Sequence, residues 1–373
     1  MEDYFFFLGR NPDLSLQEII SFLEARGIEG NFIIEDNIAL FSLGKEINPD
    51  EMTAKLGGTI KIGKALIAEK NQQKFLQAIK KSSLYTGESN KIKFTITVYP
   101  PEEEISSSIK EILYDFFKEE RIRAFYKPSA GTPSESIKFD LEFFAIKMKD
   151  NYYFGKIDAV YDAKDAEFRD MHRPFRRSEL AISPRLAKIL VNLSGATENS
   201  TLLDPFCGVG TIMQEALLQN INVIGADIDP GAVENCKTNI AWLKKTYPIS
   251  ASDNIFTSSA IDIPKIIKQK VDAVASEPFL IPLITYTPKD KEARKMISRA
   301  KEIYITTLKE LEKILKEKAR VALSLPVMKA RESKVRLNIE EICYETGLKL
   351  VAGPFSESRP GQRVEREIVL LEK

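Results

Sequence analysis

The residues best suited to chemistry lie between Thr201 and Thr211, in the stretch TLLDPFCGVGT. The apolar residues at its start predict a buried strand, its two glycines predict a tight turn, and a helical pattern begins at Ile212. Glycine lets a backbone approach a ligand closely, and doubly wound sheets bind their ligands at the carboxyl ends of strands. The stretch therefore predicts a cofactor-binding loop.

An acidic residue ends the next predicted strand, which covers 223–227. This residue, Asp227, lies roughly 20 residues after Gly208, the offset at which an acid meets a ribose hydroxyl in nucleotide-binding folds. The glycine loop and the acid together favour a cofactor that contains a nucleoside.

The loop does not have the sequence of a phosphate-binding loop. It lacks GxxxxGK[ST], and Met213 stands where the third glycine of GxGxxG would fall. The carboxylate of Asp204 would repel a pyrophosphate but suits an amino group or a sulfonium. S-adenosyl-L-methionine therefore fits the site better than NAD or ATP. Asp262, after the third strand, either holds the adenine amine or caps the helix from Ile263.

Composition limits the partners and the metals. The chain has 373 residues, with 54 basic and 54 acidic side chains, so nucleic-acid binding requires a local basic patch. One histidine and three scattered cysteines without a CxxC pair predict a site without metal. Because no basic region precedes a long apolar run, neither a signal peptide nor a membrane span is expected, and the protein is predicted to be cytoplasmic.

The N-terminal part of the chain shows the order β-α-β-β-α-β, which is typical of ferredoxin-like domains. Strands are predicted at 4–10, 32–35, 38–43 and 59–68, with one helix ending near Gly27 and another at 49–56. Ser15 and Glu18 predict a capping box at the start of the first helix.

Basic and aromatic residues alternate in the following segment. Its predicted elements are helices at 72–81 and 102–119, a strand at 91–100 and a hairpin turning at 150–151. Arg121, Arg123 and Lys127 interleave with two aromatic residues, which suits RNA phosphates and exposed bases. A solvated loop is the alternative, and this segment alone favours it.

Arginines are concentrated between the two halves of the chain. They either clamp RNA phosphates or form an ion-pair network between domains. The arginines concerned are Arg169, Arg173, Arg176 and Arg177. Pro184 then opens a helix that is expected to cover the cofactor's methionine end.

Three motifs carry a resemblance to a known family: RDMHRPFRRSELAISPRLAKILVNLSG, LLDPFCGVGTIMQEAL and GADIDPGAVENC. With YFFFLGRNPDLSLQEI near the N-terminus, they resemble the THUMP-domain tRNA guanine-N(2)-methyltransferase family over nearly the whole chain. The resemblance implies an α/β chain: a ferredoxin-like domain at 1–68, a THUMP RNA-binding domain at 69–160, a linker at 161–180, and a class I Rossmann-like methyltransferase domain at 181–373 with a mostly parallel seven-stranded sheet.

The resemblance also implies roles at the cofactor, with the glycine loop along the methionine part and Asp227 at the ribose. Together with Asp262 and Pro184, the residues expected at the cofactor are Asp204, Pro205, Phe206, Gly208, Gly210, Thr211, Asp227 and Ile228.

The reactive motif departs from the family, which carries Asp or Asn, two prolines and an aromatic residue after the fourth strand. This chain has Ser276, Glu277, Pro278 and Phe279 there. A guanine amine needs an acceptor for its hydrogens, because its lone pair is delocalised into the ring. Ser276 can accept only weakly, whereas an inward-facing Glu277 could accept, since burial would raise its pKa. Phe279 would stack the extruded base. Otherwise Glu277 faces solvent and Ser276 caps the loop.

The sequence therefore predicts an S-adenosylmethionine-dependent tRNA methyltransferase that acts on a guanosine exocyclic amine. Ring-carbon methylation is disfavoured because the reactive motif has no cysteine. A non-catalytic RNA-binding homologue and an amine methyltransferase for another base, including adenine in DNA, are the alternatives. The expected partner is tRNA, and a small activating subunit, as in eukaryotic relatives, is left open.

Overall fold

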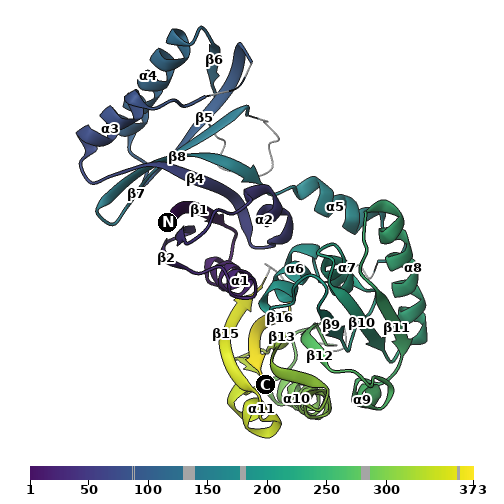
Figure 1. Cartoon of the computed structure of the whole chain (residues 1–373). Coiled ribbons are helices and arrows are strands. Elements are labelled where there is room, and N and C mark those ends of the chain that lie inside the picture. Colours follow the sequence, from purple (N-terminus) through teal and green to yellow (C-terminus); the bar gives the residue numbers. More distant parts are fainter. Residues whose placement is uncertain (86, 88, 129–138, 177–181, 279–285, 359–361) are drawn as a thin grey trace. The chain divides into compact units, whose positions relative to one another are not determined.

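The computed structural model describes residues 1–85, 87, 89–128, 139–176, 182–278, 286–358 and 362–373, which form two compact units (Figure 1). The first unit consists of Met1–Leu8, Glu29–Ala54 and Thr59–Tyr161. The second consists of Gly9–Ile28, Lys55–Gly58 and Asp162–Lys373. Each unit is built around one large sheet.

The sheet of the first unit has eight strands in the order β2-β3-β1-β4-β8-β7-β5-β6. These are β1 (Glu2–Leu8), β2 (Gly30–Glu35), β3 (Ile38–Leu43), β4 (Thr59–Glu69), β5 (Lys91–Tyr99), β6 (Arg123–Tyr126), β7 (Leu141–Met148) and β8 (Asn151–Val160). The unit also holds helices α2 (Pro49–Lys55), α3 (Gln72–Lys81) and α4 (Glu103–Glu119). Phe75 of α3 and Phe117 of α4 pack with Phe94 and Phe143 of the strands, which closes the core on one face of the sheet.

The strands predicted from period-two alternation are present, and the boundary predicted at residue 68 falls inside the sheet. β4 pairs antiparallel with β8 from Lys61 opposite Val160 to Glu69 opposite Tyr152. The strands on both sides of that boundary therefore share one hydrogen-bonded sheet. The division of this part of the chain into a ferredoxin-like domain and a THUMP domain stays a prediction.

Helix α1 (Pro12–Glu24) belongs to the second unit, and its start differs from the prediction. The cap is Asn11, whose side chain accepts a hydrogen bond from the Leu14 N–H at 3.3 Å. Ser15 donates to the Asn11 carbonyl instead of capping, and Glu18 is fully buried. The predicted capping box was wrong, because the helix already begins at Pro12 and Asn11 is its cap.

The sheet of the second unit runs β11-β10-β9-β12-β13-β16-β15, with β14 (Lys334–Arg336) paired to β13 off this path. The strands are β9 (Thr201–Asp204), β10 (Asn222–Asp227), β11 (Asp253–Thr257), β12 (Val271–Ser276), β13 (Leu315–Lys329), β15 (Lys349–Glu357) and β16 (Val364–Glu372). β9 to β13 pair in parallel, while β16 runs antiparallel to both neighbours. This confirms the predicted α/β class and the mostly parallel sheet of seven strands, to which β14 adds an eighth.

Helices cover both faces of this sheet, as two separate apolar clusters show. One cluster contains side chains of α6 (Pro184–Leu193), α7 (Thr211–Leu217) and α8 (Pro230–Thr246). The other contains side chains of α9 (Ile263–Ile266), α10 (Asp290–Glu312) and α11 (Ile339–Thr346). The sheet therefore forms the middle of three layers, and its loops at the carboxyl ends of the strands are free to build a site.

The linker predicted at 161–180 contains a helix. α5 spans Ala163–His172 and is capped by the Asp162 side chain, which accepts from two backbone N–H groups at 3.0 Å each. Among the helices of the described residues, none is long and apolar enough to cross a membrane.

Candidate active site

A cavity of about 670 Å³ lies at the carboxyl ends of β9, β10 and β12. Small-molecule sites typically enclose about 300–1,000 Å³. The lining residues are Ile182, Asp204, Pro205, Phe206, Cys207, Gly208, Val209, Thr211, Ile212, Asp227, Ile228, Asp229, Ser259, Ala260, Ile261, Glu277, Pro278, Glu302, Ile303, Thr306 and Thr307. The cavity is thus large enough for a nucleoside cofactor and lies where the glycine loop predicted it.

The glycine loop needs its glycines for two different reasons. Gly208 and Gly210 both have positive φ angles, of 54° and 87°, which L side chains rarely adopt. A Cβ atom on Gly210 would also lie 2.6 Å from the Cys236 Sγ of α8. The loop therefore turns tightly from β9 into α7 and leaves its backbone facing the cavity.

Asp227, at the end of β10, is tied to the glycine loop. Its Oδ2 accepts a hydrogen bond from the Gly208 N–H at 2.9 Å, and its Oδ1 accepts from the Asp229 N–H at 3.0 Å. These bonds hold the carboxylate at the cavity wall, where the offset from Gly208 predicted a ribose-binding acid. An ionised carboxylate keeps further lone pairs with which to accept from ribose hydroxyls.

Asp204 is the most strongly perturbed acid of the site. It is 1% exposed, and it accepts hydrogen bonds from the Ser276 hydroxyl at 2.6 Å and the Phe206 N–H at 3.2 Å. Burial raises the pKa of Asp204 to about 7, and the negative charges of Asp227 and Glu277 act in the same direction. The two hydrogen bonds oppose this rise because they favour the ionised form. Asp204 can therefore exchange a proton near neutral pH.

Glu277 also lines the cavity, but its carboxylate is paired. Arg366 of β16 donates to it through Nε and Nη2, the latter at 3.3 Å, and the Ser324 hydroxyl of β13 donates at 3.1 Å. The side chains of Glu277 and Arg366 are 9% and 12% exposed. A two-point arginine pair holds a carboxylate in one orientation. Glu277 is therefore anchored to the neighbouring strands rather than turned freely into the cavity.

Most of the predicted cofactor residues line the cavity, and three do not. Asp204, Pro205, Phe206, Gly208, Thr211, Asp227 and Ile228 are in the lining. Gly210 is absent from the lining and caps α7. Pro184 is the first residue of α6, whereas Ile182 lines the cavity. Asp262 pairs with Lys265 at 2.6 Å on the surface and is also absent from the lining.

The reactive motif is only partly described. Pro278 lines the cavity, and Ser276 lies behind Asp204 with its hydroxyl directed to that carboxylate. Phe279 lies outside the described residues, so its predicted stacking role stays a prediction. Of the motif, Glu277 and Pro278 line the cavity, beside Asp204 of the glycine loop.

Sequence reasoning missed the wall that α10 contributes. Glu302, Ile303, Thr306 and Thr307 all line the cavity. Their spacing of one, three and four residues places them on one side of a helix, which was a usable signal.

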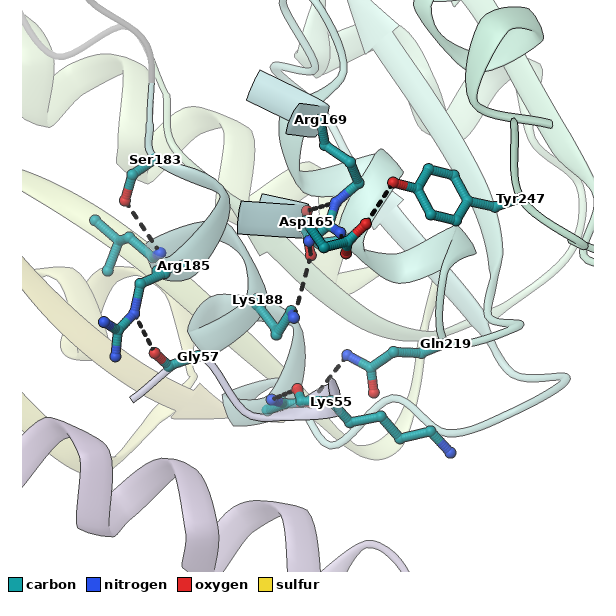
Figure 2. A network of polar contacts seen from close by, with 12 residues as sticks. Lys55, Gly57, Asp165, Arg169, Ser183, Arg185, Lys188, Gln219 and Tyr247 are labelled. Atoms are coloured by element: carbon teal, nitrogen blue, oxygen red, sulfur yellow. Dashed lines mark hydrogen bonds and ion pairs between the residues drawn. The ribbon is translucent and has the colours of Figure 1, made fainter. Parts of the chain in front are cut away.

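Two arginines predicted to bind RNA point into the protein. Arg169, 4% exposed, donates to the Glu215 carboxylate at 3.2 Å and 3.4 Å and pairs with Asp165. Lys188 lies 3.7 Å from the same Glu215 carboxylate, and Tyr247 donates to Asp165 at 2.7 Å (Figure 2). The RNA-binding role predicted for Arg169 is therefore wrong, because buried acids already neutralise its charge.

Arg173 is likewise buried, and it reaches the cofactor loop. It is 4% exposed and donates to the Thr211 hydroxyl at 2.7 Å and to Asp170 at 2.9 Å. Since Thr211 lines the cavity, Arg173 positions the first residue of α7 and is not available to RNA. Arg176 pairs with Asp170 at 3.0 Å and stays partly exposed, and Arg177 lies outside the described residues.

The side chains present fit S-adenosylmethionine. Asp227 offers acceptors at the ribose position, and Asp204 offers a negative charge for an amino group or a sulfonium. Exposed Ile228 and Ile261 offer apolar surface to an adenine ring. In the described part of the chain, no group of three His, Cys, Asp or Glu side chains is placed to hold a metal ion.

The chain matches two methyltransferase family models. The family described as RMKL-like, methyltransferase domain matches residues 172–341, and the family described as DNA methylase matches residues 14–238. A solved structure of TrmN from Thermus thermophilus has the same fold, with a TM-score of 0.53 at 14% identity over 100% of this chain and 99% of that one.

Curated relatives carry the name tRNA (guanine(10)-N2)-dimethyltransferase. One from Methanothermobacter thermautotrophicus is 40% identical over 26% of this chain and 27% of its own length. One from Methanocaldococcus jannaschii is 29% identical over 41% and 44%, and one from Pyrococcus abyssi is 31% identical over 40% and 41%. The chain thus spans less than half the length of these three relatives, and within those spans the resemblance to tRNA guanine-N(2)-methyltransferases is confirmed. Because the DNA methylase model covers more than half of the chain, the protein belongs to that family of S-adenosylmethionine-dependent methyltransferases.

Proposed function

We propose that this protein is a tRNA methyltransferase that transfers a methyl group from S-adenosylmethionine to the exocyclic amine of a guanosine. The observation that carries the proposal is the pairing of a nucleoside-sized cavity with Asp204, an acid whose pKa is about 7, beside the reactive motif. The names of the curated relatives supply the substrate class. The cytoplasm is the compartment that we expect.

Asp204 is the residue that we assign to the amine. The cofactor supplies an electrophilic methyl group, and the amine becomes more acidic as it is methylated, so a nearby group must accept a proton. Asp204 lines the cavity and is poised to accept near neutral pH, with Ser276 orienting its carboxylate. Glu277 is a weaker candidate because Arg366 and Ser324 already hold both of its oxygens.

A basic patch in the first unit supports binding of RNA. In the parallel pairing of β5 and β6, Lys91 lies opposite Arg123 and Lys93 lies opposite Phe125. These four side chains therefore share one face of the sheet. Lys127 continues the same alternation, and all five are exposed. The Lys91 Nζ lies 5.7 Å from the centre of the Phe125 ring. An exposed ring among four cations suits an unpaired base and its phosphates.

Arg121, predicted to contact RNA, is exposed just before this strand. We keep Arg121, Arg123 and Lys127 as the proposed RNA contacts, together with the partly exposed Arg176.

A second substrate, the amine of adenine in DNA, is favoured by the DNA methylase match over residues 14–238. Methyl transfer from radiolabelled S-adenosylmethionine to unmodified tRNA and to duplex DNA, run side by side, separates the two. Incorporation into tRNA alone supports the proposal, incorporation into DNA alone replaces it, and binding of RNA and cofactor without incorporation indicates a non-catalytic homologue.

A further inference from the structure

One side of α10 forms a wall of the cofactor cavity. Lys301 and Lys309 on the other side pair with Glu341 and Glu345 of α11, both at 2.7 Å. Tyr304 and Leu308 pack on the sheet. The remaining arc of the helix surface therefore faces the cavity and not α11. It carries Glu302, Ile303, Thr306 and Thr307.

Beside this arc lies the short turn after β11, which contacts α10. Ala260 and Ile261 of this turn line the cavity, and Ala260 belongs to the same apolar cluster as Tyr304 and Leu308. Asp227 connects the glycine loop to this end of the cavity. Its carboxylate accepts a hydrogen bond from the Gly208 N–H, and the next residue in the sequence is Ile228. With the ribose at Asp227 and the methionine part along the glycine loop, the adenine is left for the end formed by Ile228, Ile261 and α10.

An adenine ring offers an exocyclic amine that donates hydrogen bonds and ring nitrogens that accept them. Asp262, the predicted acceptor, pairs with Lys265 and does not line the cavity. Glu302 does line it, is exposed, and has no hydrogen-bond or ion-pair partner within the described ranges. Thr307 Oγ1 is buried at the same wall without a hydrogen-bond partner among the described residues. Free acceptor and donor groups thus meet at the adenine end.

We infer that Glu302 of α10 accepts a hydrogen bond from the adenine amine of the cofactor and so selects for adenine, in place of Asp262. The inference rests on the proposed function, since it assumes that S-adenosylmethionine occupies the cavity. The rim position of Glu302 leaves its carboxylate hydrated until the base covers it, and a hydrogen bond to a charged acceptor is stronger than one to a neutral group.

The test is calorimetric titration of the full chain with S-adenosylhomocysteine and with its 6-deamino analogue, in which a hydrogen atom replaces the adenine amine. The wild-type protein is expected to bind S-adenosylhomocysteine about tenfold or more tightly than the analogue, the usual value of a hydrogen bond to a charged group. Glu302→Ala should lose this preference while binding the analogue as the wild-type protein does. Glu302→Gln, which keeps an acceptor, should retain part of the preference, and Asp262→Ala should retain all of it.

The binding of the analogue reports on folding and on the rest of the site in every variant. An unchanged preference in Glu302→Ala, or an equal loss for both ligands, overturns the role of Glu302 while the cofactor proposal stands. If Asp262→Ala loses the preference for S-adenosylhomocysteine over the analogue, Asp262 is the acceptor for the adenine amine. A wild-type protein that binds neither ligand contradicts the proposed function itself.

Discussion

The Ser276 hydroxyl at the end of β12 donates a 2.6 Å hydrogen bond to the Asp204 carboxylate at the end of β9. This bond joins the residue that departs from the family's reactive motif to the first acid of the glycine loop. Ser276 is fully buried, so it cannot act as the direct acceptor that its place in the sequence suggested. Its structural effect is to orient Asp204 and to favour the ionised form of that acid.

Methyl transfer should depend on the ionisation of Asp204. Its pKa of about 7 predicts a rate that falls as the pH drops below about 7, because the protonated acid cannot accept a proton. Ser276→Ala removes a hydrogen bond that lowers this pKa, so the acidic limb of the profile should move to higher pH, by about one pH unit. Profiles of kcat against pH for the two proteins test this. If the acidic limb of the kcat profile is the same in Ser276→Ala as in the wild-type protein, a group other than Asp204 controls the pH dependence.

Glu277 and Arg366 should contribute more to stability than to proton transfer. Arg366→Met leaves a largely buried carboxylate without its cation, at a cost of about 3 kcal/mol in the free energy of unfolding. Urea denaturation measures this cost, and the double variant Glu277→Gln, Arg366→Met should recover part of it. Asp204→Asn should lower kcat by about 100-fold or more, whereas Glu277→Gln should lower it far less. The reverse order would make Glu277 the acceptor.

Arg173 should act on the cofactor through Thr211. Thr211→Val removes the hydroxyl that accepts from Arg173 and leaves a buried guanidinium nitrogen unpaired, which typically costs about 1–3 kcal/mol. We expect weaker binding of S-adenosylhomocysteine by calorimetry and unchanged affinity for tRNA. Arg176→Ala is the control for cofactor binding, because Arg176 bonds to Asp170 and not to Thr211; as a proposed RNA contact it should weaken the binding of tRNA instead. Weaker binding of tRNA alone in Thr211→Val would assign this region to RNA.

Phe125 and its cations should bind RNA without affecting the cofactor. Phe125→Ala should weaken tRNA binding by about 1–3 kcal/mol if the ring stacks a base. Lys91→Ala should flatten the salt dependence of binding, because one phosphate contact is lost. Fluorescence titrations over a range of salt concentrations measure both effects. Phe32→Ala, another exposed phenylalanine of the same unit, is the matched control, and an equal loss in that variant would rule out a specific role for Phe125.

Periodicity predicted most of the fold because each element buries one regular face. The strand after residue 90 begins with alternating exposed and buried residues from Lys91 to Phe94, and α3 was predicted with the bounds that the structure shows. The glycine loop and Asp227 were found because their spacing is fixed by close backbone approach. Such local rules need no knowledge of which segments meet in space.

The missed features all depend on contacts between distant segments. Glu18 looked like a capping residue, but it accepts from the Gly57 and Gly58 N–H groups at 2.7 Å each. Arg169 was predicted to be accessible to RNA, but its guanidinium is paired with the carboxylate of Glu215, which lies far along the chain. The sequence does not single out Glu302, because only the fold brings this part of α10 to the cavity. A single sequence does not say which of its charges will be paired.

The most direct test of the central claim is to incubate the protein with unmodified tRNA and S-adenosylmethionine, digest the RNA, and identify the nucleosides by mass spectrometry. The account predicts guanosine methylated on its exocyclic amine with the wild-type protein and a strongly reduced yield with Asp204→Asn. A product methylated on another base, or none although tRNA and cofactor both bind, would contradict it.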